Sequence, residues 1–156
     1  MNAEQWNAAY PVGSPVLAYP GCRPEDDPAG ELLITCTQTR AQKSSSGDDV
    51  VWVEGHGAYI CLTHVDAVTE EQWEQARIDR DEATAARRAA LLDAIRARPA
   101  GAWKTERVLF ALKQAGFGWV GARTAKADLE ALAADGHLTP VTEVVIRHYE
   151  LAEAAS

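Results

Sequence analysis

The chain has 156 residues, of which 47% are hydrophobic and 24% charged, and its 15 basic and 23 acidic side chains give a formal net charge of −8. This composition predicts a folded globular protein of one ordinary domain or two very small ones, and it excludes intrinsic disorder. The sequence has no apolar run of membrane-spanning length, no signal peptide and no close cysteine pair, so we expect a cytoplasmic protein without disulfides.

Residues 1–68 alternate turn-forming residues with short stretches that have strand character. Those stretches are rich in β-branched and aromatic side chains and cover residues 16–19, 32–39, 50–54 and 58–62. The last two flank the sequence Gly-His-Gly at 55–57, which predicts a tight hairpin. Several short strands in so small a segment predict an antiparallel β-barrel.

The order of residues in this segment resembles that of SH3-like barrels. The resemblance rests on Gly13-Ser14-Pro15-Val16, Val51-Trp52-Val53 and Leu62-Thr63-His64-Val65. With the alanine- and arginine-rich composition of the whole chain, the segment is similar to small barrels of actinobacterial phage and mobile-element proteins. The resemblance implies that the acidic barrel recruits a protein partner or mediates a homodimer.

Cysteine and histidine side chains in the same segment are the candidates for metal binding or catalysis. Cys61 and His64 have the spacing of metal ligands, but a zinc site normally adds a second close pair, and none is present. A Cys–His hydrolase would pair Cys61 with His64 or His56. Residues three apart on a strand point to opposite faces, so Cys61 and His64 would not meet. We therefore predict no enzymatic activity, no metal and no cofactor.

Residues 69–85 predict a charged connecting helix. Thr69 and Gln72 have the spacing of a capping box, in which each side chain bonds the backbone of the other. No glycine or proline follows until Pro99, and alanine, glutamate and arginine dominate the stretch. The pattern predicts either one continuous helix or two helices broken near residues 81–84.

Residues 86–156 predict a helix, a short extended segment at 101–104, a helix at 106–115, a turn, a helix at 123–135 and a two-stranded hairpin. Thr105 is predicted to cap the second helix, and Gly116 and Gly136 to end the second and third. In the third helix the apolar side chains that recur at helical spacing are predicted to face the core, namely Ala125, Leu129 and Leu132.

This order of elements resembles a winged helix-turn-helix. The sequence of the third helix is similar to that of the DNA-reading helix in this family: it is Arg123-Thr124-Ala125-Lys126-Ala127-Asp128-Leu129-Glu130-Ala131-Leu132, followed by Gly136-His137-Leu138. The resemblance implies that this helix enters the major groove of double-stranded DNA. It assigns DNA contacts to Arg123, Thr124 and Lys126, whose groups suit guanine edges, phosphates or a thymine methyl. In the hairpin, Arg147 or His148 would meet a phosphate. The predicted hairpin loop has no basic residue, which argues against its insertion into a minor groove.

The charge is distributed unevenly along the chain. The net charge is −6 over residues 1–68, −4 over 69–85 and +2 over 86–156, so the predicted DNA reader is the only positive segment. We predict an α+β protein with an SH3-like barrel at 1–68, a connecting helix at 69–85 and a winged helix-turn-helix at 86–156. Its predicted function is DNA-binding regulation, with a modest and salt-sensitive affinity or one that depends on a dimer. The alternative is a protein–protein adaptor that binds no DNA.

Overall fold

The computed structural model describes residues 1–27, 30–142 and 147–151, with the side chains of 142, 147 and 151 left undescribed. Within those residues the chain is a mixed α and β structure with small antiparallel sheets, none of which closes into a barrel. Internal contacts divide it into two compact units, Met1–Arg80 (unit 1) and Asp81–Ser156 (unit 2). None of the described helices combines the length and the apolar composition of a membrane span.

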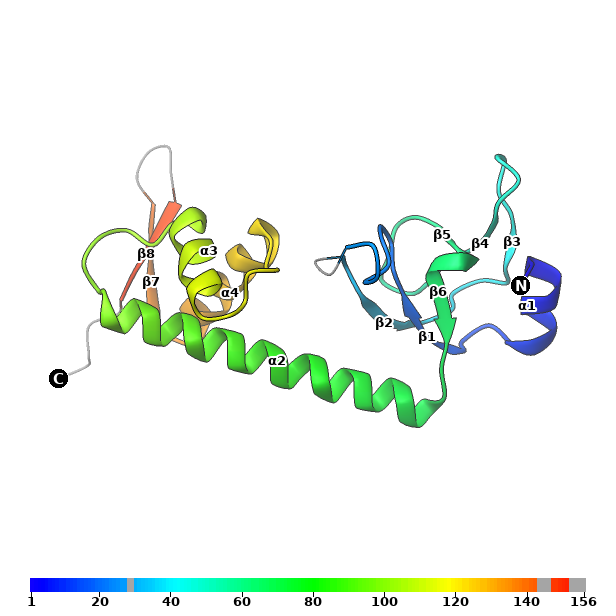
Figure 1. Ribbon diagram of the computed structural model, residues 1–156, viewed down its shortest axis with the longest axis horizontal. Helices are drawn as coiled ribbons and strands as arrows, with labels where there is room; N and C mark the ends of the chain where they lie inside the picture. The colour runs from blue at the N-terminus through cyan, green and yellow to red at the C-terminus, as the bar shows by residue number, and fades with distance from the viewer. Residues whose placement is uncertain (28–29, 143–146, 152–156) are drawn as a thin grey trace. The chain divides into compact units, whose positions relative to one another are not determined.

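Unit 1 contains two three-stranded antiparallel sheets, in the orders β2-β1-β6 and β3-β4-β5 (Figure 1). Its elements are α1 (Ala3–Ala9), β1 (Pro15–Ala18), β2 (Leu33–Cys36), β3 (Gln42–Lys43), β4 (Asp49–Val51), β5 (Ile60–Cys61), the 3-10 helix η1 (Leu62–His64) and β6 (Val65–Ala67). In the first sheet Val16 lies opposite both Thr35 and Ala67 and is fully buried. The presence of both helices and antiparallel strands confirms the predicted mixed α and β class.

Helix α1 is an element that the sequence reading missed. Asn2 caps it by accepting a hydrogen bond from the Gln5 amide at 2.9 Å, and the Gln5 side chain accepts from the Asn2 amide at 3.0 Å. Trp6, only 4% exposed, anchors the helix in the core of unit 1. A helix of 7 residues is too short to display a helical period, so only the capping box could have indicated it.

The predicted hairpin around residues 55–57 exists, but it is not tight. Strand β4 ends at Val51 and β5 begins at Ile60, and these two residues pair. Between them the chain changes partners, because the Gln38 amide donates to the Trp52 carbonyl at 2.8 Å and the Glu54 amide to the Cys36 carbonyl at 2.9 Å. The return to β5 therefore needs a wide loop.

Helix α2 (Glu70–Ala97) is one continuous helix, so the alternative of a break near residues 81–84 is wrong. The predicted capping box is confirmed: the Gln72 amide donates to Thr69 Oγ1 at 3.2 Å, and the Thr69 amide donates to Gln72 Oε1 at 3.0 Å. In its first turn, Trp73 Nε1 donates to the Thr35 carbonyl of β2 at 3.0 Å. The helix begins in unit 1 and ends in unit 2.

Unit 2 contains the second part of α2, followed by α3 (Thr105–Gln114), α4 (Ala122–Ala134), β7 (Leu138–Thr142) and β8 (Arg147–Leu151). The helices lie within two residues of their predicted bounds, and β7 and β8 pair as the predicted hairpin, whose residues 143–146 lie outside the described chain. Trp103 adds a bridge to Tyr149, with both backbone hydrogen bonds formed at 2.9 and 3.2 Å. Within the predicted extended segment at 101–104, Trp103 is thus a strand partner of β8, whereas Gly101 lies in a bend with a φ of 87°.

The helix ends in unit 2 agree with the sequence prediction except at the N-cap of α3. Gly116 and Gly136 have positive φ angles of 91° and 78°, a conformation that only glycine adopts without strain, and they end α3 and α4 as predicted. Thr105 is not the N-cap. Lys104 occupies that position without a side-chain cap, and Thr105 is the first helical residue, two residues after Trp103, whose pairing with Tyr149 fixes the chain there.

Candidate nucleic-acid interface

Helix α4 has one face buried in unit 2 and one face in solvent. Ala125, Leu129 and Leu132 are at most 3% exposed, which confirms the predicted core face. Arg123, Lys126, Ala127 and Glu130 are exposed and form what we call the outer face of α4. At about 100° per residue, Arg123, Lys126 and Glu130 fall within about 60° of one another around the helix axis.

A buried ion pair between α2 and α4 fixes the rotation of α4, and sequence reasoning missed it. Asp128 is completely buried and accepts from Arg87 Nε at 2.6 Å and from Arg87 Nη2 at 2.9 Å. Arg88 Nε donates to the same carboxylate at 3.0 Å. Two guanidinium groups thus share one carboxylate, and this geometry is possible only with Asp128 turned towards α2 and the outer face of α4 turned away.

The signal for this ion pair was present in the sequence. Asp128 lies among the core positions of α4, and Arg87 precedes the buried Leu91 and Ile95 at steps of four residues on α2. An acidic group on one apolar face and a basic group on another predict a buried pair when the two faces pack.

Of the four residues predicted to contact DNA, two lie together on the outer face of α4. Arg123 and Lys126 are exposed there, one turn apart. Thr124 is half-buried and lies about 100° around the helix from Arg123, so it borders this face. Arg147 begins β8 opposite Thr142, and its side chain lies outside the described residues. His148, its neighbour, is only 6% exposed and does not offer its ring to a phosphate.

Lys104 is a further cation at this site that the sequence reading did not select. It lines a small hollow of about 70 Å³ together with Thr105, Lys126 and Tyr149. Two lysine side chains therefore line the hollow, beside the N-terminus of α3, which has no side-chain cap. Lys126 also lies 3.9 Å from the Glu130 carboxylate in an exposed pair, which lowers the net positive charge of the outer face.

Arg107 holds the segment between α2 and α3 in place. Its Nη1 donates to the carbonyls of Ala100 and Gly101 at 3.0 and 3.1 Å, and its Nη2 donates to the Arg98 carbonyl at 3.0 Å. Its guanidinium carbon lies 4.0 Å from the centroid of the buried Trp103 ring. These contacts attach α3 to the segment that precedes it, and they thereby fix the position of the Lys104 backbone between the two.

The cysteine and histidine candidates of unit 1 lie on several elements, and the strand assumed for Cys61 and His64 ends at Cys61. His64 belongs to the 3-10 helix η1, and its Nδ1 lies 3.0 Å from the Thr63 hydroxyl. Burial raises the pKa of the Cys36 thiol, so the protonated form is favoured there and not the nucleophilic thiolate. No group of three or more His, Cys, Asp or Glu side chains in the described chain could hold a metal ion.

Comparison of the chain with protein-family models, with curated proteins and with solved structures gives no match. The geometry of the two units is therefore the basis for any assignment of function.

Proposed function

We propose that the chain is a DNA-binding regulatory protein that contacts double-stranded DNA through the outer face of α4. Unit 2 is then a winged helix-turn-helix, and unit 1 an SH3-like module for protein contacts. The observation that supports this best is the placement of Arg123 and Lys126 side by side on the exposed face of a helix whose opposite face is buried. A helix presented in this way fits the width of the major groove, and its basic groups suit phosphates and guanine edges.

The order and pairing of elements in unit 2 support the same proposal. The end of α2, the strand-like segment at Trp103, α3, α4 and the β7–β8 hairpin follow one another, and Trp103 pairs with β8. In a winged helix-turn-helix this small sheet supports the reading helix and its hairpin forms the wing. Unit 1, with its two small antiparallel sheets and acidic sequence, is the candidate for protein contacts.

A phosphate contact is expected beside the outer face of α4. Lys104 and Lys126 line the same hollow, and the first amides of α3 have no side-chain cap. Free amides at a helix N-terminus, together with ammonium groups, suit a phosphate oxygen. Such a contact would fix the register of α4 along the groove, while Arg123 would contact a base edge or a second phosphate.

The modest positive charge limits the affinity. Residues 86–156 have a net charge of +2, and Glu130 lies within the outer face of α4. We expect micromolar rather than nanomolar binding by one chain, with a dimer as the means to reach higher affinity, and a steep decrease with salt.

Fluorescence anisotropy of the whole chain with mixed-sequence duplexes tests this function. At about 50 mM salt we expect saturable binding, and at about 200 mM a loss of most of the affinity. The double variant Arg123→Ala/Lys126→Ala should lose most of the binding at the lower salt concentration. Arg96→Ala, which removes an exposed arginine of α2 paired with Asp93, is the matched control and should bind as the unchanged chain does.

A protein–protein adaptor is the second candidate function, and exposed aromatic side chains favour it. Phe110 of α3 is 58% exposed and Trp119 of the following turn 48% exposed, and such residues are enriched at protein interfaces. The adaptor predicts no DNA binding even at low salt and no effect of the Arg123→Ala/Lys126→Ala variant. Binding that disappears in that variant would exclude it.

A further inference from the structure

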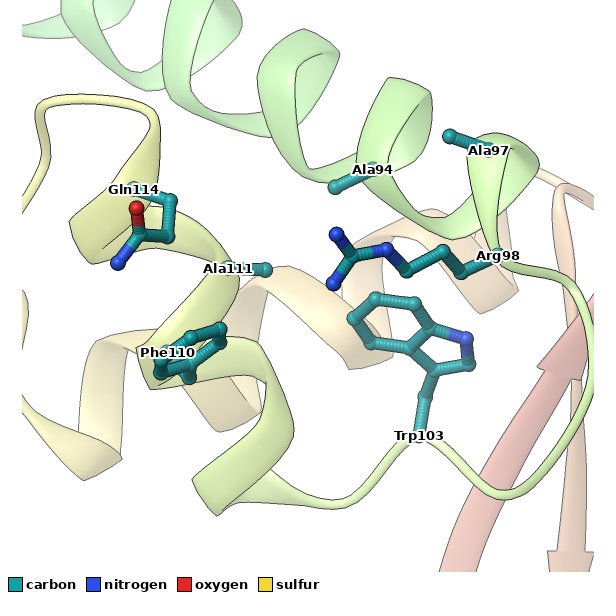
Figure 2. A pocket seen from close by; sticks show the side chains of 7 residues that line it. All are labelled: Ala94, Ala97, Arg98, Trp103, Phe110, Ala111 and Gln114. Carbon is teal, nitrogen blue, oxygen red and sulfur yellow. The ribbon is translucent and has the colours of Figure 1, made fainter.

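A pocket in unit 2 lies between the C-terminal end of α2 and helix α3. Its volume is about 410 Å³, which is within the usual range for small-molecule sites. Figure 2 shows Ala94 and Arg98 on one side, Phe110, Ala111 and Gln114 on the other, and the ring of Trp103 below. We call this the Trp103 pocket. None of the residues of the outer face of α4 lines it.

Most of the surface in the Trp103 pocket is apolar and aromatic. The Trp103 side chain is held rigidly, since it is 2% exposed and Arg107 stacks on its ring at 4.0 Å. Phe110 is 58% exposed at the rim, and the small side chains of Ala94 and Ala111 leave the space open. A flat apolar group placed here would contact the small part of Trp103 that is open to the pocket, and it would remove surface of the exposed Phe110 ring from water.

Arg98 supplies a single positive charge to this apolar space. Figure 2 shows its guanidinium group extending over the pocket beside Ala94 and Ala111. Its backbone is fixed, because its amide donates to the Ile95 carbonyl at 3.1 Å and its carbonyl accepts from Arg107 Nη2 at 3.0 Å. Within the described residues the guanidinium has no hydrogen bond or ion pair, whereas nearby Arg96 pairs with Asp93.

We propose that the Trp103 pocket binds a small aromatic carboxylate. The ring of the ligand would lie against Trp103, Ala94 and Ala111, and its carboxylate would accept two hydrogen bonds from Arg98. A guanidinium group suits a carboxylate because its two parallel N–H groups match the two oxygens. The Gln114 amide, on the opposite side, offers a further donor. Among the described residues no carboxylate lines the pocket, so a cationic ligand would lack a partner there.

Isothermal titration calorimetry with two matched probes tests this proposal. 2-Naphthoate carries the carboxylate, and 2-naphthamide has the same rings without the charge. We expect naphthoate to bind the whole chain at least about tenfold more tightly than the amide, which is the size expected for charge-assisted hydrogen bonds. Arg98→Gln should abolish this preference, and Arg96→Gln, on the same helix but outside the pocket, should preserve it.

Two further measurements locate the bound probe. In ¹H–¹⁵N spectra, naphthoate should shift the indole N–H signal of Trp103 and leave that of Trp52, in unit 1, unchanged. Ala111→Leu, which fills the pocket, should remove the binding of both probes. The other signals in the spectrum of this variant should keep the dispersion of a folded protein.

Four results would overturn the proposal. Two are the absence of naphthoate binding at about millimolar concentration and equal affinities for the two probes. The third is a preference for naphthoate that Arg98→Gln does not reduce. The fourth is a chain that sediments as a dimer and becomes monomeric on Phe110→Ser, because a second copy would then occupy the pocket.

Discussion

Each unit contains a buried polar side chain that orders the structure around it, but the two side chains differ in charge. In unit 1 the Thr37 hydroxyl, on a residue 1% exposed, accepts from the Gly13 and Ser14 amides at 3.0 and 3.1 Å. In unit 2 the completely buried Asp128 carboxylate accepts from Arg87 and Arg88. The hydroxyl fixes a turn to a neighbouring strand, whereas the carboxylate fixes one helix on another.

The difference shows what each kind of buried group contributes. A buried hydroxyl costs little once it is hydrogen-bonded, so Thr37 can orient a turn at a small cost in stability. A buried carboxylate costs several kcal/mol in desolvation, and its attraction to the guanidinium groups must offset that loss. In unit 2 the ion pair contributes structural specificity. Asp128 has its partners in only one rotation of α4, which is the rotation that exposes Arg123 and Lys126.

The largest effect is expected for Asp128→Ala. The substitution leaves the buried Arg87 without its partner, and breaking a buried pair in this way costs about 3–5 kcal/mol. Native-state amide hydrogen exchange, followed separately in the two units, should show that loss in α4 and in the second part of α2. Amides of β1 and β2 in unit 1 serve as the internal control. A loss below about 1 kcal/mol would contradict the importance given to this pair.

A smaller effect is expected for Thr37→Val, which keeps the shape of the side chain and removes its hydroxyl. The Gly13 and Ser14 amides lose their side-chain acceptor, and the Pro11 carbonyl loses a donor at 3.3 Å. We expect unit 1 to lose about 1–3 kcal/mol. Thr39→Val, at an exposed position two residues along, is the matched control. If Thr37→Val cost as much as Asp128→Ala, the contrast between the two units would disappear.

The sequence predicted most reliably those elements whose cause is local. The capping box at Thr69 and the end of α4 at Gly136 depend on a few neighbouring residues, and both are confirmed. Features that depend on distant partners were missed. Arg87 and Asp128 are 41 residues apart, and only the packing of two helices brings them together.

The same distinction explains the errors in unit 1 and at the cap of α3. The hairpin around residues 55–57 is wide because residues 52–54 pair with a strand more than a dozen residues earlier, which no local pattern indicates. Thr105 is a good capping residue by type, but the pairing of Trp103 with Tyr149 displaces the start of the helix. The Trp103 pocket likewise forms only when α2 and α3 are brought together.

The smallest effect is expected for Asp49→Asn in unit 1. The pKa of the Asp49 carboxyl is lowered below its usual value, and the hydrogen bond that the carboxylate accepts from the Ala3 amide is the largest cause. A lowered pKa in the folded state adds stability above the unfolded value, near 3.9, and that stability is lost as the pH falls through the folded value. Asp49→Asn should therefore slightly destabilise unit 1 at pH 7.

The pH dependence separates this effect from a general loss of packing. The difference between the unchanged chain and Asp49→Asn should shrink as the pH falls below about 4. Thermal unfolding measured from pH 7 to 3 provides the comparison. Asp48→Asn removes a carboxylate from the same turn, one that accepts from the Ser46 hydroxyl, and is the matched control. A difference that stays constant with pH would contradict the role of the charge.

The salt dependence of DNA affinity is the most direct test of the outer face of α4. For the unchanged chain, the logarithm of the association constant should fall linearly with the logarithm of salt concentration, by about 0.9 for each phosphate contact. If Arg123 and Lys126 both contact phosphates, Arg123→Ala/Lys126→Ala should reduce that slope by about two. An identical slope in the unchanged chain and the double variant would contradict the account, because DNA would then be bound elsewhere.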